Sequence, residues 1–146
     1  MLETLQLIAT LCTALFAGAA IYINVAEHPA RMQLDTRSAV SQWAPSYKRA
    51  TWLQGPLAVA GFLASMVAWL LGAGVIWLIA ALFIGAAVPF TFVVIMPTNH
   101  LLLAEGRDLD SAETRQLLER WGRLHLVRSI VSTIATVIML WGLLQN

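Results

Sequence analysis

The sequence predicts an all-α membrane protein, a four-helix transmembrane bundle in up-down-up-down order that forms one domain over residues 1–146. Its composition supports this, because 59% of the residues are hydrophobic and only 12% are charged, whereas soluble domains carry about a quarter charged residues. The length of the apolar segments also supports it, since about 20 helical residues cross a hydrocarbon core of about 30 Å. The segments of sufficient length are Leu5 to Val25, Trp52 to Leu71, Val75 to Met96 and Leu124 to Leu144.

The first segment is expected to remain in the membrane rather than be removed as a signal peptide. Residues 1–6 include Glu3 and no Lys or Arg, whereas a secretory signal begins with positive charge. The single cysteine, Cys12, lies inside this segment. An intramolecular disulfide and a CxxC metal or redox site are therefore both excluded.

The connections predict how the helices are ordered and oriented. Gly72-Ala73-Gly74 is so short that the second and third helices must be antiparallel neighbours. The positive-inside rule places the other two connections in the cytoplasm and both termini outside. All Lys and Arg residues lie on or beside those two connections: Arg31, Arg37, Lys48, Arg49, Arg107, Arg115, Arg120, Arg123 and Arg128.

Prolines and capping residues suggest helix ends within the two basic connections. Asp35 is expected to cap a short helix that Pro45 ends. Pro97 should break or kink the third helix. Asp110, with Glu113 three residues later, has the spacing of a capping box. No proline follows this cap, so the fourth helix is expected to extend beyond the membrane on the cytoplasmic side.

A polar cluster is expected where the helices meet the basic connections. Ionisable groups near a membrane edge are unfavourable unless they are paired, hydrated or used in function, so the cluster is a candidate site. It contains all three histidines of the chain. The candidate residues are Asn24, Glu27 and His28 on the first helix, Asn99 and His100 on the third, and Trp121, His125 and Arg128 on the fourth.

Helical spacing predicts that the first and fourth helices face each other. Residues three and four apart share a face, as Ala20, Asn24 and His28 do on the first helix. Trp121 and His125 follow the same spacing on the fourth. Because small and polar stripes pack inside a membrane bundle, we expect a polar cavity between the two helices that opens to the cytoplasmic side.

Two kinds of chemistry fit these residues. Glu27, His28, His100 and His125 could hold a single iron or copper ion, or zinc, because imidazole and carboxylate ligate these metals. Neighbours on a helix diverge by about 100°, so Glu27 and His28 cannot both point straight at one ion. Alternatively the site needs no cofactor, and the same groups act as general acid and base on a bound substrate.

Arg128 is expected to have an acidic partner, because it lies one turn deeper in the membrane than His125. Glu27 is the acidic residue nearest in depth. The sequence therefore predicts that Glu27 and Arg128 lie within direct or one-water hydrogen-bonding reach, with His28 or His125 completing the cluster. The alternative is structural: Glu27 pairs with Arg128 or Arg31, and the histidines are interfacial residues only.

Four short motifs lie at the membrane ends of the helices: Asn24-x-x-Glu27-His28-Pro29-Ala30-Arg31, Trp43-x-Pro45-Ser46-Tyr47-x-Arg49, Met96-Pro97-x-Asn99 and Trp121-x-x-x-His125-x-x-Arg128. In this order they resemble the DUF1772, or anthrone oxygenase-like, family. The resemblance implies a four-helix membrane protein related to fungal enzymes that use dioxygen to oxidise an anthrone to an anthraquinone. It implies that the family's polar positions, which do not include His100, fall on Asn24, Glu27, His28, Arg31, Asn99, Trp121, His125 and Arg128.

Three functions remain open at this point. The first is an oxidoreductase of oxygenase type that acts on a hydrophobic aromatic substrate of anthrone type, with His125 or Glu27 as base. The second is a non-catalytic membrane subunit or scaffold that binds a partner through its cytoplasmic loops. The third is a small transporter working as a homo-oligomer, against which the chain shows no internal repeat. The expected partners are the lipid bilayer and a hydrophobic small molecule. No nucleic-acid partner is expected, because the net charge is only +1 and nucleic-acid binding usually demands a concentrated basic face.

Overall fold

The computed structural model describes residues 1–145, and within them it contains helices and turns but no strand. Four helical spans are long and apolar enough to cross a membrane, which confirms the predicted all-α transmembrane bundle. The first span is α1 (Leu2–Tyr22), η1 (Ile23–Glu27) and α2 (His28–Arg31); the second is α3 (Thr36–Ala68) and η2 (Trp69–Ala73); the third is α4 (Val75–Phe90), η3 (Thr91–Ile95) and α5 (Met96–Leu102); the fourth is α6 (Ala112–Leu144). Elements denoted η are π-helical turns in the first and third spans, whereas η2, at the end of the second span, contains the non-helical Gly72.

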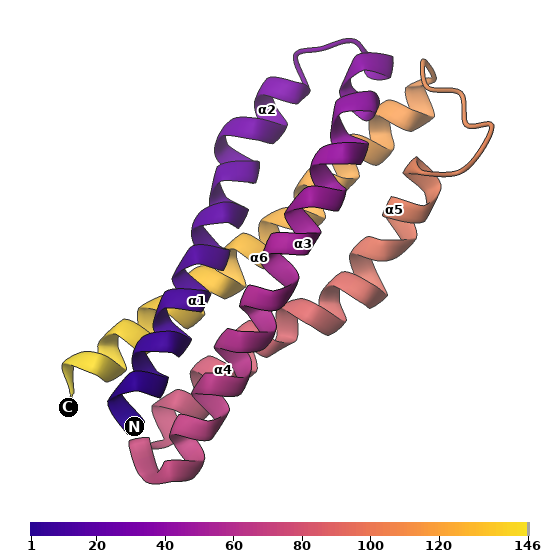
Figure 1. Ribbon diagram of the computed structural model, residues 1–146. Helices are drawn as coiled ribbons and strands as arrows, with labels where there is room; N and C mark the ends of the chain where they lie inside the picture. Colours follow the sequence, from indigo (N-terminus) through magenta and orange to yellow (C-terminus); the bar gives the residue numbers. More distant parts are fainter. Residues whose placement is uncertain (146) are drawn as a thin grey trace.

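The spans alternate in direction, with both termini and the glycine turn at one end of the bundle and the two longer connections at the other (Figure 1). The first span packs on α3 and α6, and α4 packs on the same two helices from another side. Gly72 and Gly74 both have positive φ, 93° and 96°, a conformation open to glycine at little cost. The glycine hairpin between the second and third spans is thus confirmed.

The buried side chains form two apolar groups along the bundle. The group nearer the termini is rich in alanine and includes Phe16, Trp77 and Ile84. Small residues let membrane helices approach closely, which is how such a bundle packs without a hydrophobic driving force in lipid. The group nearer the two connections is built around Trp43 and Trp121. On α6, His125 and Arg128 lie between these two groups.

The π-helical turns η1 and η3 are each followed by a proline two residues after their last residue. The His28 amide donates to the Ile23 carbonyl and the Met96 amide donates to the Thr91 carbonyl, each five residues back, and the next residues are Pro29 and Pro97. A proline ring clashes with the carbonyl four residues earlier, and a widened turn moves that carbonyl away. Pro97 therefore neither ends nor sharply breaks the third span, because the turn before it absorbs the clash.

At the first basic connection the predicted helix cap at Asp35 is confirmed, whereas the predicted helix end at Pro45 is wrong. Asp35 is the cap of α3, as expected: its carboxylate accepts the Ser38 amide at 2.9 Å, and this hydrogen bond lowers the pKa of Asp35. Pro45 was wrongly expected to end a short helix, since α3 continues through it; Pro45 is exposed, so the carbonyl that it leaves free faces outward.

The expected capping box at Asp110 and Glu113 is also wrong. Ser111 caps α6 by accepting the Thr114 amide. The Asp110 carboxylate instead binds the Arg37 guanidinium with two oxygens, at 2.5 to 3.2 Å. The ion pair between the two connections therefore takes the carboxylate that the cap would have used.

The length of α6 agrees with the expected extension of the fourth helix. It begins twelve residues before Leu124 and contains 33 residues, roughly 50 Å at 1.5 Å per residue and longer than a hydrocarbon core of about 30 Å. The end that extends is the one that carries the two basic connections.

The orientation of the bundle can be tested with cysteines in a Cys12→Ser background. Ser41 and Gln145 are exposed at opposite ends. With the basic connections inside, a membrane-impermeant maleimide should label Gln145→Cys in intact cells and Ser41→Cys only after permeabilisation. The reverse pattern would place the basic connections outside and contradict the positive-inside prediction.

Candidate functional site

Trp121 is the centre of a buried aromatic cluster at the end of the bundle that carries the basic connections. Its ring stacks on His125 with centroids 4.9 Å apart. It meets the edge of Trp43 at 5.9 Å and a tilted His28 ring at 5.3 Å. The Arg31 guanidinium lies 5.9 Å from the same ring. Residues from the first, second and fourth spans are thereby held in one rigid unit.

Arg31 is the cation of this unit, and only 3% of it is exposed. Its guanidinium hydrogen-bonds the Glu27 carboxylate, the Gln42 and Ser46 side chains, and His28 Nδ1 at 3.3 Å. The Ser46 hydroxyl also donates to Glu27. Since a guanidinium has no acceptor, it donates to His28 Nδ1.

The predicted Glu27–Arg128 pair is wrong. Glu27 forms its ion pair with Arg31, one helical turn further along the same face. Within residues 1–145 no carboxylate lies within ion-pairing distance of Arg128. The structural alternative for Glu27, an ion pair with Arg31, is the arrangement found.

Arg128 is bound by the amide oxygen of Gln54 and by the face of the Phe16 ring, not by a carboxylate. Its Nη2 donates to Gln54 Oε1 at 2.7 Å. Its guanidinium carbon lies 5.2 Å from the centroid of the Phe16 ring, at a distance where cation–π attraction acts. Its Nε has no hydrogen-bond partner in the described chain. The cation therefore retains capacity to bind an anionic group.

His125 is 1% exposed and its tautomer follows from its neighbours. Asn24 Nδ2 donates to the Gly122 carbonyl at 3.1 Å, which turns Asn24 Oδ1 toward His125 Nδ1, 2.8 Å away. Ser129 also donates to Asn24 Oδ1, at 2.7 Å. An amide oxygen only accepts, so Nδ1 carries the proton and Nε2 carries the lone pair. Nε2 has no partner among residues 1–145.

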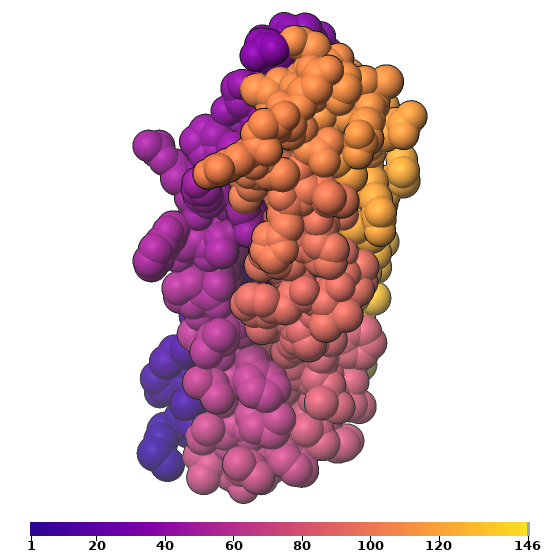
Figure 2. All heavy atoms as spheres, turned by 90° about the vertical axis from the view of Figure 1, so that its right-hand side faces the viewer, coloured from indigo at the N-terminus to yellow at the C-terminus, as the bar shows by residue number. Residues whose placement is uncertain are grey.

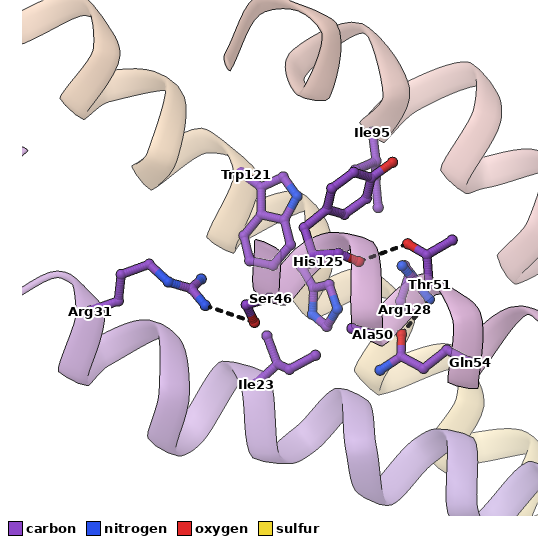
Figure 3. Close-up of a pocket in the computed structure, with 11 residues that line it drawn as sticks. Ile23, Arg31, Ser46, Ala50, Thr51, Gln54, Ile95, Trp121, His125 and Arg128 are labelled. Carbon is purple, nitrogen blue, oxygen red and sulfur yellow. Dashed lines mark hydrogen bonds between the residues drawn. The ribbon is translucent and has the colours of Figure 1, made fainter. Parts of the chain in front are cut away.

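His125 lines a narrow cavity of about 10 Å³ between the helices, room for about one water, and its ring lies between Trp121 and the Gln54–Arg128 pair (Figure 3). A second cavity of about 120 Å³ adjoins it and shares Tyr47, Thr51, Gln54 and Arg128. The second cavity is mostly apolar. The two together form one elongated site with His125 at the polar end, which is lined by Ile23, Arg31, Ser46, Tyr47, Ala50, Thr51, Gln54, Ile95, Trp121, His125 and Arg128.

Comparison with known sequences decides the family. A family model described as anthrone oxygenase matches residues 43–138, which include the whole α3 and α6 faces of this cavity. The chain belongs to the anthrone oxygenase family. Anthrone oxygenase tpcL of Aspergillus fumigatus is 30% identical over 153 residues, which cover 97% of this chain and 94% of the relative. Anthrone oxygenase ptaC of Pestalotiopsis fici is 33% identical over 115 residues, 68% of this chain and 80% of the relative. No solved structure matches.

The polar positions of this anthrone oxygenase family member differ in where they lie: some line the cavity, some support a cavity residue from behind, and others lie away from the cavity. Trp121, His125 and Arg128 line the cavity, and Asn24 orients His125 from behind. His28 packs behind Trp121.

The remaining predicted residues lie away from the cavity. Glu27 faces a polar groove on the outside of the bundle. Asn99 is fully buried and donates to Met96 Sδ at 3.9 Å, and it does not line the cavity. His100 is exposed.

The proposed ligand set of Glu27, His28, His100 and His125 is not assembled. Among residues 1–145, no three His, Cys, Asp or Glu side chains lie close enough together to hold a metal ion. His28 Nδ1 already accepts from Arg31, and His125 Nδ1 is bound to Asn24. The arrangement fits general acid–base chemistry at His125 Nε2 better than a shared metal.

Four polar cavity residues on α3 were not predicted from the sequence: Ser46, Tyr47, Thr51 and Gln54. Ser46 and Tyr47 belong to one of the motifs behind the family resemblance, but were given no role. Gln54 is 2% exposed, and a buried amide inside an apolar span needs a partner. That signal was present in the sequence.

Gly122 provides a test of how closely the first and fourth spans pack. A Cβ at this position would overlap the His28 ring, so Gly122→Ala should destabilise the protein by about 1–3 kcal/mol through overpacking. Gly18→Ala is the matched control, because a Cβ there meets nothing within 4 Å. Thermal unfolding in detergent should show a lower midpoint for Gly122→Ala only. Equal midpoints would mean that His28 does not pack against α6 as described.

Proposed function

We propose that the protein is a membrane-embedded oxygenase that oxidises an anthrone-type substrate in the His125–Arg128 cavity. The observation that carries the proposal is a buried imidazole with a free, oriented Nε2 beside a buried guanidinium that has no carboxylate partner. The names of the two relatives supply the substrate class. A base and a cation at one site suit a reaction in which a carbon acid loses a proton.

The first step is proton removal. An anthrone is a tricyclic aromatic ketone with an acidic CH₂ group, and its anion is delocalised onto the ketone oxygen. His125 Nε2 accepts the proton while Nδ1–H stays on Asn24 Oδ1, which stabilises the imidazolium as it forms. Arg128 stabilises the negative oxygen of the anion, as a preorganised cation does in a site that excludes water.

Dioxygen is the oxidant in the later steps. Electrons of the anion pass to dioxygen and a C–O bond forms at the carbon that lost its proton, and the resulting peroxide takes the proton back from His125. His125 then removes the second hydrogen of that carbon as a proton, the O–O bond breaks and the new carbonyl forms. The leaving hydroxide takes that proton as water, so one anthrone and one dioxygen give one anthraquinone and one water.

The lining of the site suits a flat, apolar ring system. The two adjoining cavities, of about 10 and 120 Å³, are smaller than small-molecule sites of roughly 300–1,000 Å³, so side chains or helices must move apart to admit the ring. Phe16, Tyr47 and Trp121 provide aromatic surfaces. The polar groups lie at one end of the site, and the central ring of the substrate would be placed there, with its CH₂ carbon toward His125 and its ketone oxygen, on the opposite edge of that ring, toward Arg128.

The proposal is tested by turnover in lipid nanodiscs. Purified protein should convert an anthrone to its anthraquinone faster than empty nanodiscs, with one dioxygen consumed per anthraquinone formed. Absorbance of the quinone and an oxygen electrode measure the two quantities. A rate equal to the spontaneous oxidation in empty nanodiscs would refute the proposal.

A further inference from the structure

An apolar groove between α3 and α4 extends from the lipid-facing surface toward the site. It is open to the surface, with a volume of about 470 Å³, and its lining includes Ala58, Val59, Phe62, Leu82, Ala86 and Val88. Figure 2 shows the face of the bundle on which α3 (magenta) and α4 (pink) lie side by side. No charged side chain lines this groove.

The groove adjoins the candidate site. It shares Ala58 and Val88 with the 120 Å³ cavity. That cavity in turn shares Gln54 and Arg128 with the His125 cavity. Three neighbouring hollows therefore lie in series between the surface of α3 and α4 and His125.

The surface at the end of the site near the basic connections carries polar and charged side chains, unlike the α3–α4 groove. A polar groove there shares Ser46 and Ala50 with the His125 cavity. At that border Arg31 and Ser46 both hydrogen-bond Glu27. An apolar ring passing this way would have to displace a buried ion pair, whereas the α3–α4 route is lined by apolar side chains until it reaches Arg128.

We infer that the substrate reaches His125 laterally from the bilayer through the α3–α4 groove. The inference rests on the proposed function for the identity of the occupant: a flat polycyclic aromatic with an apolar body and a ketone oxygen on the edge of its central ring. The apolar body matches the groove, and the oxygen matches Arg128 and Gln54 at its inner end. The hydrocarbon part of a lipid would fill the groove but has no oxygen to place against Arg128, and a fatty acid, whose carboxylate could bind Arg128, is the competitor that the experiment includes.

Gly55 allows the route to be blocked without disturbing the fold. It lines the 120 Å³ cavity, and a Cβ there meets nothing within 4 Å, so Gly55→Phe should fill the passage. Ile130→Trp is the matched control. Ile130 lines a groove of about 290 Å³ between the first span and α6 that shares no residue with the His125 cavity.

The experiment has a binding arm and a turnover arm, both in nanodiscs. A diazirine-bearing anthraquinone, mapped by mass spectrometry, should label residues 58–62 and 82–89, and Gly55→Phe should reduce this labelling at least tenfold while Ile130→Trp leaves it unchanged. In turnover, Gly55→Phe should lower kcat/KM at least tenfold and kcat much less, because access is slowed rather than chemistry.

The arms separate failure of the lateral route from failure of the proposed function. Specific labelling of the groove without anthrone turnover by the parent protein would refute the function and still support the route. Labelling in the polar groove or between α1 and α6, or labelling insensitive to Gly55→Phe, would overturn the route. So would a diazirine fatty acid that labels the α3–α4 groove and is not displaced by the anthraquinone.

Discussion

Replacing His125 by Gln is expected to lower kcat for anthrone oxidation by about 10²–10⁴-fold, the usual contribution of a general base. Gln can still accept or donate beside Asn24, but it offers no basic nitrogen at the position of Nε2. KM should change little, because the apolar cavity that binds the ring system remains. Single-turnover quinone formation in nanodiscs measures the effect.

The pH dependence of the defect distinguishes a lost base from a damaged fold. As the pH approaches the pKa of the anthrone itself, the substrate ionises without help, so the ratio of parent to variant rates should fall. A misfolded variant would show a constant ratio. A His125→Gln protein that keeps the parent rate at neutral pH would show that another group removes the proton.

The second large effect is expected for the Glu27–Arg31 pair. Glu27→Gln should destabilise the protein by about 3 kcal/mol, the lower end of the range for breaking a buried ion pair. Arg31 would be left buried and uncompensated, since its side chain is 2% exposed, although Glu27 itself is 21% exposed. The double variant Glu27→Gln, Arg31→Met should lose less than the sum of the single changes, because it leaves no isolated charge.

The exposed pair Arg37–Asp110 is the matched control for this measurement. Its side chains are 58% and 60% exposed, so Asp110→Asn should cost less than about 1 kcal/mol. Chemical unfolding in detergent micelles compares the variants on one scale. Similar losses at Glu27 and Asp110 would mean that the Arg31 cluster is hydrated rather than buried.

Apolar length and glycine content were sufficient to predict the bundle. The spans, their alternation and the turn at Gly72 and Gly74 all follow from local physical rules that packing does not override. Pro45 shows where such rules fail: a proline on an exposed face leaves a carbonyl that needs no helical partner, so α3 continues. A single sequence does not say which face of a helix will be exposed near a connection.

The site was predicted only in part, because helical spacing selects a face but not a partner. His125 and Arg128 were found by their position on an inward stripe. The partner of Arg128 was not predicted, because Gln54 carries no charge and an arginine inside a membrane bundle was expected to pair with a carboxylate. Glu27 was assigned to Arg128 on depth alone, while Arg31 lay one turn away on the same helix.

The π-helical turn η1 holds one residue more than an α-helical turn, and this residue sets the direction in which the later side chains of the first span point. One extra residue is accommodated in that turn, and each residue of an α-helix turns by about 100°. A deletion of one residue within Ile23–Glu27 that restores a regular α-helix would therefore leave His28 and Arg31 facing Trp121, whereas a regular α-helix that keeps every residue would rotate them by about that angle relative to α1. Alignments with distant relatives that lack this turn should thus place a one-residue gap here, because an alignment without the gap pairs residues that face different sides of the bundle.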